Sequence, residues 1–210
     1  MVDSLLIGFF AAIFLLIITP GPGVLSTAGV GSAFGFRSGL RYVTGLFIGN
    51  NLVGILVVSG LATVIIASPW ARNFLLFLST GYLLYLAARI AFAGSRIGFI
   101  RADKKPGLLA GITLQLINPK AYVVNTTLFS GFGFYPESLL IETLIKFLAF
   151  NLVWVPVHLL WLWLGVKLQS MNLAPAIQFR VNLSMALAMV VVVLLAFFSS
   201  PLAQDMLSRV

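Results

Sequence analysis

Long apolar runs, separated by short polar stretches, dominate this chain of 210 residues. Six runs stand out, at about 5–26, 40–68, 70–93, 108–132, 139–166 and 182–199. A helix needs ~20 apolar residues to cross a bilayer, and each run is close to that length. The pattern therefore predicts an all-α membrane protein with six transmembrane helices, in a single transmembrane domain over 1–210. Only Ser68 and Pro69 separate the second run from the third, which predicts a tight hairpin.

Prolines interrupt two of the six predicted helices. The breaks consist of Thr19, Pro20, Gly21, Pro22 and Gly23 in the first helix and of Asn118, Pro119 and Lys120 in the fourth. Pro20 and Pro119 are 99 residues apart, and the tripeptide that begins at Asn51 recurs 100 residues later at Asn151. These matches predict two three-helix repeats, at about 4–94 and 107–200. Three crossings are an odd number, so the second repeat must be inverted, which is typical of secondary transporters.

Composition agrees with the membrane assignment. Charged residues make up 9% of the chain, against about 25% in globular proteins, and hydrophobic residues make up 60%. So few charges exclude a cytosolic enzyme or a soluble binding module. The basic residues that give the chain a net charge of +8 lie between the apolar runs. They therefore indicate how the loops are placed about the membrane rather than nucleic-acid binding. With no Cys and one His, thiolate and His-rich metal sites are excluded, and no cofactor is expected.

Basic residues gather on one side of the predicted bundle. The loops after the first, third and fifth helices, with the end of the third helix, hold Arg37, Arg41, Arg89, Arg96, Arg101, Lys104, Lys105, Lys167 and Arg180. The opposite side holds at most Arg72, Lys146 and Arg209. Because cytoplasmic loops are enriched in Lys and Arg, both termini are predicted to lie outside the cytoplasm.

The break at 19–23 is the strongest candidate for a binding site. Its two prolines remove two backbone donors, and unwound backbone at membrane depth must be buried in protein or face water. The freed carbonyls can accept hydrogen bonds from an ammonium group. The helix that restarts after Pro22 offers N–H groups and a positive dipole end to an anion. A zwitterionic amino acid would use both ends, whereas a purely structural kink is the alternative.

Lys120 is the charged residue closest to the predicted midplane. It lies ~12 residues into the fourth helix, which at ~1.5 Å per residue is ~18 Å deep. A lysine there costs at least ~2.5–3.5 kcal/mol unless it is solvated or paired. We expect its ammonium group either to bind an anionic group of a substrate or to act as a structural tether to carbonyls of the opened helix.

Other polar residues give weaker indications. Asn51 and Asn151 occupy equivalent positions in the repeats and are candidates to bind a substrate amine together with the freed carbonyls. Contacts between helices are the alternative role of such amides. His158 is a candidate proton carrier, since its charge changes near neutral pH. Its neighbours Trp154, Trp161 and Trp163 favour a place in the interfacial aromatic belt instead, so His158 is left out of the predicted site.

Two further pairs are interpreted as structural. Glu142 and Lys146 are four residues apart, acid first, and are expected to pair on one helix face. Gly45 with Gly49, and Gly107 with Gly111, suit close helix contacts. Those contacts could lie within the bundle or in a homodimer, and the sequence leaves both open.

Two other classes of protein remain open. Ser130 with His158 suggests an intramembrane hydrolase, but Leu128 stands where the serine turn of such enzymes needs glycine, and no pair of buried Asp residues is present. A non-transporting accessory or structural membrane protein is the other alternative, and it would have no reason to open two helices.

Four motifs together resemble the LysE/RhtB family of amino-acid exporters. They are Thr19 to Pro22, Gly35 to Leu40, Gly81 to Leu86 and Asn118 to Ala121, in the family's order. The resemblance covers essentially the whole chain. It implies export of amino acids or their derivatives across the bacterial inner membrane, driven by the proton gradient. The family often has Asp near Asn50 and Asn51, whereas no carboxylate lies deep in a helix here, which disfavours cationic substrates such as lysine.

The combined prediction is a secondary exporter of a small amino acid or derivative that works by alternating access. The two breaks are expected to meet near the midplane, where Lys120 or the restarted helix binds the carboxylate. The proton would be carried by His158, by Lys120 or by the substrate itself.

Overall fold

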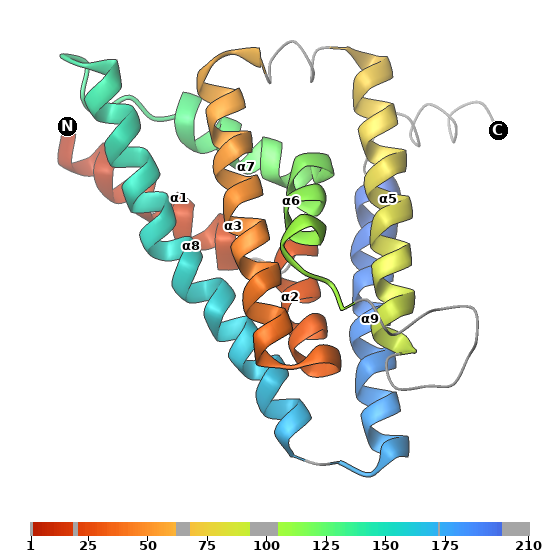
Figure 1. The fold of residues 1–210 in the computed structure, drawn as a ribbon. Coiled ribbons are helices and arrows are strands. Elements are labelled where there is room, and N and C mark those ends of the chain that lie inside the picture. Colours follow the sequence, from red (N-terminus) through yellow and green to blue (C-terminus); the bar gives the residue numbers. More distant parts are fainter. Residues whose placement is uncertain (1, 19–20, 62–67, 93–104, 172, 199–210) are drawn as a thin grey trace.

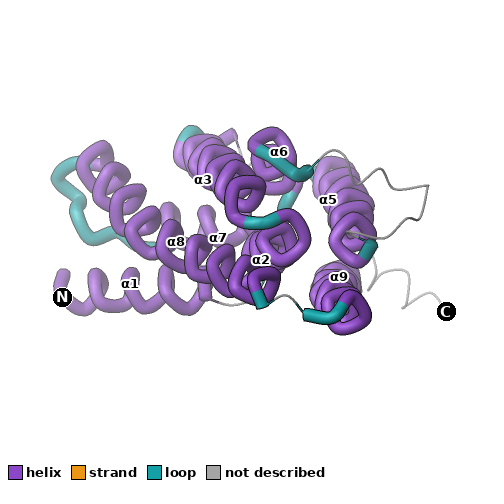
Figure 2. Tube along the Cα trace, turned by 60° about the horizontal axis from the view of Figure 1, so that its bottom comes forward, coloured by secondary structure: helices purple, strands orange, loops and turns teal. Residues whose placement is uncertain are grey.

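The computed structural model describes residues 2–18, 21–61, 68–92, 105–171 and 173–198, and their regular secondary structure is entirely helical. The helices are α1 (Val2–Ile18), α2 (Pro22–Phe34), α3 (Phe36–Val58), α5 (Pro69–Ala91), α6 (Leu108–Ile117), α7 (Pro119–Ser130), α8 (Leu139–Ser170) and α9 (Pro175–Phe198). In Figures 1 and 2, α2, α3 and α6 occupy the centre, with α1 and α8 on one side and α5 beside α9 on the other.

Three helices are long and apolar enough to cross a membrane, within α3, α5 and α8. Helices α1 and α2 form a fourth candidate span, bent by 47° at the break between them. Apolar stretches of α6 and α9 are shorter. The described residues therefore give three to four candidate spans plus shorter apolar helices, which is a multi-pass membrane protein. The sequence predicts more detail than this, namely six spans in two inverted repeats, and that detail stays a prediction.

Both predicted helix breaks are present. Helix α1 ends at Ile18 and α2 begins at Pro22, while Thr19 and Pro20 lie outside the described residues. Helix α6 ends at Ile117 and α7 begins at Pro119. Proline suits a first helical position, because the N–H that it lacks would have no acceptor within the helix. Each proline therefore starts a new helix rather than kinking a continuous one.

Glycines bring backbones from distant parts of the chain together. A β-carbon on Gly45 of α3 would lie 2.0 Å from the carbonyl oxygen of Leu108, and one on Gly111 of α6 would lie 2.3 Å from that of Tyr42. A β-carbon on Gly165 of α8 would lie 2.2 Å from the carbonyl oxygen of Ala28 in α2. Only glycine permits such approaches. Gly45 and Gly111 thus make helix contacts within the bundle. The sequence had left open whether such contacts lie in the bundle or in a homodimer.

Asn51 and Asn151, which the sequence predicts to occupy equivalent positions, meet between α3 and α8. The Nδ2 of Asn51 donates to the Oδ1 of Asn151 at 3.2 Å, and the Nδ2 of Asn151 donates back at 2.8 Å. A reciprocal contact between residues 100 positions apart is what a two-fold relation between the helices would produce. The two amides therefore hydrogen-bond to each other. This is the contact between helices given above as the alternative to substrate binding.

The expected pair of Glu142 and Lys146 is confirmed. The Nζ of Lys146 lies 2.7 Å from the Oε1 of Glu142, and both side chains are buried. The second carboxylate oxygen accepts from the backbone N–H groups of Phe134 and Tyr135 at 2.9 and 2.7 Å. Lys146 also donates to the carbonyl of Phe129 at 2.9 Å. The pair therefore ties the loop after α7 to the start of α8.

Described helix ends and turns beside the loops predicted to lie on one side of the membrane gather at one end of the bundle. The α2–α3 turn, the C-terminal end of α5 and the α8–α9 turn lie together at the lower end in Figure 1, and the α7–α8 loop lies at the opposite end. This grouping agrees with the counting of basic loops. Which end faces the cytoplasm remains the sequence-based prediction.

Candidate functional site

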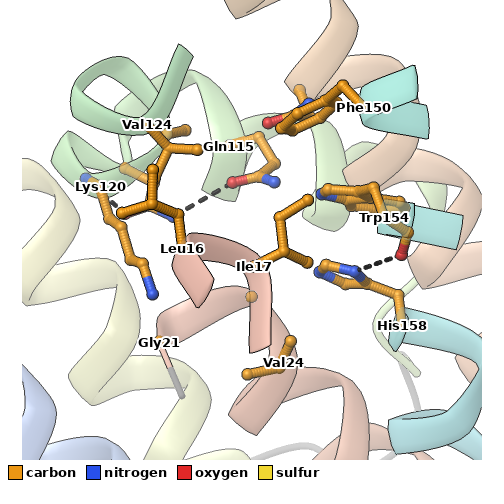
Figure 3. Close-up of a pocket in the computed structure, with 14 residues that line it drawn as sticks. Leu16, Ile17, Gly21, Val24, Gln115, Lys120, Val124, Phe150, Trp154 and His158 are labelled. Atoms are coloured by element: carbon orange, nitrogen blue, oxygen red, sulfur yellow. Dashed lines mark hydrogen bonds between the residues drawn. The ribbon is translucent and has the colours of Figure 1, made fainter. Parts of the chain in front are cut away.

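A cavity of about 50 Å³ lies between the two helix breaks. Both breaks contribute to its wall, through Gly21, Gly23, Asn118 and Lys120. Its other polar residues are Asn50, Gln115 and His158, and its apolar residues are Leu16, Ile17, Val24, Ala121, Val124, Phe150 and Trp154. Figure 3 shows these side chains converging from α1, α2, α6, α7 and α8. The predicted meeting of the two breaks is therefore observed.

The N-terminus of α2 is open toward this cavity. Pro22 has no N–H, no side chain caps the helix, and the N–H of Leu25 donates to the carbonyl of Gly21 at 3.1 Å. The N–H groups of Gly23 and Val24 consequently have no acceptor within α2. Because Gly21 and Gly23 carry no side chains, a ligand can approach this positive helix end closely.

Buried hydroxyls fix the geometry of that first turn. Ser26 and Thr27 both donate to the carbonyl oxygen of Gly23, at 2.9 and 2.8 Å. Tyr42 of α3 donates in turn to the hydroxyl oxygen of Ser26 at 2.9 Å. All three side chains are buried. The open helix end is therefore held by packing from α3 rather than by a cap of its own.

The N-terminus of α7 is closed by contrast. The Oδ1 of Asn118 caps it by accepting from the N–H of Lys120 at 3.1 Å. The Nδ2 of Asn118 donates to the Oε1 of Gln115 at 3.1 Å. Asn118 lines the cavity as predicted, but its amide is engaged in holding the second break. The two breaks thus differ chemically: among the described residues, the start of α2 has no side-chain cap, whereas Asn118 caps the start of α7.

Lys120 reaches from α7 to the open end of α2. A β-carbon on Gly21 would lie 2.8 Å from the Cδ of Lys120 and 3.0 Å from its Nζ, so the ammonium group lies directly against this glycine. Figure 3 shows the side chain extending toward Gly21. A full positive charge and a positive helix end therefore meet at one point. No Asp or Glu is among the residues that line the cavity, so an anion bound here would be attracted by both groups.

His158 faces the cavity, contrary to the expectation that it lies in the interfacial belt. It is 4% exposed, and its ring stacks on Trp154 with centroids 3.6 Å apart. Its Nδ1 lies 2.9 Å from the carbonyl oxygen of Trp154. A carbonyl only accepts, so Nδ1 carries the hydrogen and the Nε2 of the neutral ring is an acceptor. A β-carbon on Gly23 would lie 3.4 Å from Nε2, which places this acceptor opposite the start of α2.

Asn50 adds a donor that sequence reasoning passed over. Its Oδ1 accepts from Asn125 at 3.2 Å, whereas its Nδ2 has no hydrogen-bond partner among the described residues. The side chain is 3% exposed and lines the cavity. A buried donor without a partner is costly, and a ligand oxygen in the cavity would satisfy it.

The sequence-predicted site residues divide into four groups. Gly21, Gly23, Asn118 and Lys120 line the cavity. Pro22 and Pro119 start the helices that carry them but do not line it, and Asn51 and Asn151 bind each other away from it. Thr19 and Pro20 lie outside the described residues.

An apolar helical bundle with two broken helices around a small polar cavity has the architecture of a membrane translocator. The chain belongs to the LysE type translocator family, whose pattern matches residues 14–204. This is a family of transporters, not of enzymes, so the hydrolase alternative is set aside. In agreement, Ser130 is exposed at the end of α7 and does not line the cavity.

Relatives of the chain include amino-acid efflux proteins. It is 32% identical over 126 residues to a leucine efflux protein of Klebsiella pneumoniae, which covers 58% of this chain and 59% of that protein. It is 29% identical over 133 residues to a cysteine/O-acetylserine efflux protein of Salmonella paratyphi A, covering 63% and 67%. The match thus spans about three-fifths of the length of the leucine efflux protein. No solved structure gave a significant match.

Proposed function

We propose that this protein is a secondary exporter of a small neutral amino acid or amino-acid derivative, which binds in the cavity between the helix breaks. The observation that carries the proposal is the meeting of the Lys120 ammonium group with the open N-terminus of α2, opposite the acceptor nitrogen of His158. The functions of the relatives, efflux of leucine and of cysteine or O-acetylserine, support the same class of substrate.

The cavity offers complementary groups to the two ends of a zwitterion. The substrate carboxylate would lie at the start of α2, where it meets the N–H groups of Gly23 and Val24 and the ammonium group of Lys120. The Nδ2 of Asn50 is a further donor for it. The substrate ammonium group would donate to the Nε2 of His158. This replaces the earlier assignment of the amine to Asn51 and Asn151, because those amides are engaged with each other.

The rest of the wall indicates a small neutral side chain. Leu16, Ile17, Val24, Val124 and Phe150 are apolar, so they suit an aliphatic or thiol group. The absence of a carboxylate from the lining disfavours lysine and arginine. A volume of about 50 Å³ accommodates roughly three to five water-sized groups, so a side chain as large as leucine would require the wall to open.

Proton coupling can arise at His158. Its Nε2 accepts either the substrate ammonium group or a proton, and one ring nitrogen cannot accept both. Lys120 is the one other titratable group among the described lining residues, and its positive charge opposes a second cation in the cavity. Protonation from outside would therefore favour release of the substrate amine, which is the exchange that a proton-driven exporter needs.

The membrane arrangement proposed from the sequence is retained. It places the protein in the bacterial inner membrane with both termini outside the cytoplasm, and divides it into two inverted repeats. The common end of the α2–α3 turn, the C-terminal end of α5 and the α8–α9 turn supports this topology, and the reciprocal contact of Asn51 with Asn151 supports the repeat. A homodimer remains a prediction.

Efflux measurements on Lys120 variants test the proposal. Cells or inverted vesicles that contain the protein are loaded with labelled alanine, cysteine or leucine, and transport is compared with that of empty membranes. Lys120→Ala should abolish transport while the protein remains inserted. Lys120→Arg should also impair it, because a planar guanidinium does not replace a compact ammonium group. Lys167→Ala, which removes an exposed lysine of α8, is the matched control. Wild-type transport by Lys120→Ala would leave only a structural role for this lysine.

Gly21→Ala separates binding from folding. The added methyl group would occupy space 2.8–3.0 Å from the Cδ and Nζ of Lys120, and this flexible side chain can move away at little cost. We therefore expect wild-type thermal stability with strongly reduced transport. Unchanged transport would show that the ammonium group does not need its place beside Gly21.

A further inference from the structure

A second pocket lies at the end of the bundle where α2 turns into α3. It has a volume of about 340 Å³ and is lined by Phe34, Arg37, Ser38, Arg41, Lys105 and Pro106, together with Gly107. None of these residues lines the cavity at the helix breaks. The pocket is thus a separate feature that amino-acid export does not explain.

The charge of this pocket is positive. Arg37 and Arg41, one turn apart on α3, meet Lys105 from the segment before α6, and no Asp or Glu is among the described residues that line it. The guanidinium carbon of Arg89 lies 5.7 Å from the ring centroid of Phe34, which forms part of the wall. Arg89 is 8% exposed, and its Nε and Nη2 have no hydrogen-bond partner among the described residues. Three cations therefore line the pocket and a fourth stands behind its wall.

The backbone of the pocket adds to this potential. Helix α3 begins at Phe36 and α6 begins at Leu108, and neither N-terminus is capped by a side chain. Ser38 donates to the carbonyl oxygen of Pro106 at 3.0 Å, which holds the two helix starts together. Two sets of N–H groups without acceptors within their helices thus border the same cluster of cations. The arrangement suits a multiply charged oxyanion such as phosphate.

Apolar side chains next to the pocket indicate where the phosphate comes from. Phe36 and Leu40 are exposed on the first turns of α3, and Leu108 and Leu109 are exposed on the first turn of α6. They flank the cationic residues at the end of an otherwise apolar bundle. A soluble anion would make no use of them, whereas acyl chains would cover them while the headgroup enters the pocket.

We propose that this pocket binds the phosphate group of an anionic phospholipid, with its acyl chains against the exposed apolar residues of α3 and α6. Basic pockets between membrane helices bind anionic headgroups in this way. The bound lipid would bridge α3 and α6, and α6 carries Gln115 of the export cavity. The proposal does not depend on which amino acid is exported.

Native mass spectrometry of the purified full-length chain tests this inference. The protein is titrated with phosphatidylglycerol, and with phosphatidylcholine as the neutral lipid. We expect phosphatidylglycerol to bind more tightly. The double variant Arg37→Gln, Arg41→Gln should lower its affinity roughly 30-fold, with Lys105→Gln giving a smaller loss from a different segment. Lys167→Gln is the control, because Lys167 lies over the ring of Trp163 and not in the pocket.

Each outcome decides the proposal. Thermal unfolding of every variant establishes that it is folded before its lipid affinity is compared. Equal affinity of the wild type and the double variant for phosphatidylglycerol would overturn the site. Displacement of the lipid by millimolar glycerol 3-phosphate or inorganic phosphate would show that the pocket serves a soluble anion instead of a lipid. We expect the pocket variants to lose affinity for phosphatidylglycerol. We also expect that neither glycerol 3-phosphate nor inorganic phosphate displaces the lipid.

Discussion

Replacing Gly45 with alanine should push α3 away from α6 and thereby disrupt the export cavity. The added β-carbon would lie 2.0 Å from the carbonyl oxygen of Leu108, 2.8 Å from its carbonyl carbon and 3.0 Å from its Cα. These are backbone atoms of α6, so no side-chain rotation relieves the contact. Carbon and oxygen atoms in van der Waals contact are roughly 3.2–3.4 Å apart, so the two helices must separate locally by roughly 1.2–1.4 Å.

The energetic consequence can be bounded. Overpacking in a close contact costs roughly 1–3 kcal/mol, and removing a glycine from a helix returns roughly 0.5–1 kcal/mol. Because backbone meets backbone here, we expect the upper end, a net loss of about 2 kcal/mol. For a chain of this length that loss lowers the melting temperature by roughly 4–8 °C. The efflux rate should fall by more than the loss of folded protein alone would cause, because α6 carries Gln115 and ends at Asn118 in the cavity wall.

The assay is thermal unfolding of the purified protein in detergent, with efflux measured on the same variants. Gly81→Ala is the matched control, since no atom lies within 4 Å of the β-carbon that it would add in α5. That variant should be neutral or slightly stabilised. A Gly45→Ala protein with the melting temperature and efflux rate of the wild type would refute the close packing of α3 on α6.

Three further predictions concern the remaining polar contacts and the orientation. Asn51→Ala and Asn151→Ala should each lower stability by about 0.6–1.7 kcal/mol, with little further loss in the double variant and near-normal efflux; strictly additive losses in thermal unfolding would contradict the pair. Lys146→Met should destabilise the protein by roughly 3–5 kcal/mol, because the buried carboxylate of Glu142 loses its cation, and a melting curve like that of the wild type would contradict this. Glu137→Cys, in a chain without other cysteines, should react with a membrane-impermeant maleimide on intact cells, and its protection would reverse the proposed orientation.

The helix breaks and four of the fourteen residues that line the cavity were predictable because their signals are local. Proline and glycine act on the backbone at their own positions, so the starts of α2 and α7 follow directly from Pro22 and Pro119. The depth of Lys120 followed from counting along an apolar run, and the structure places it beside Gly21. These inferences needed no knowledge of which helix faces pack together.

The residues that were missed depend on the orientation of a helix about its axis. Helix α8 is apolar on all sides, so its sequence does not show which side faces the bundle. Trp154 is 3% exposed and Trp163 is 51% exposed, so these tryptophans belong to different faces, and His158 lies with the buried one. Similarly, Asn50 and Asn51 are adjacent, but successive helical residues point about 100° apart. Equivalence between repeats selected Asn51, whereas tertiary packing brings Asn50 to the cavity.

The glycine contacts also limit how the molecule can change shape. They join α2 to α8 and α3 to α6, so each one links the first sixty residues to the part of the chain after residue 107. Two halves rocking as independent blocks would have to pull both of these contacts apart. Bending at the break between α1 and α2, or at Asn118, disturbs neither contact. We therefore expect the cavity to open by bending at these two breaks. The contacts of α2 with α8 and of α3 with α6 would stay fixed and hold both halves of the sequence together.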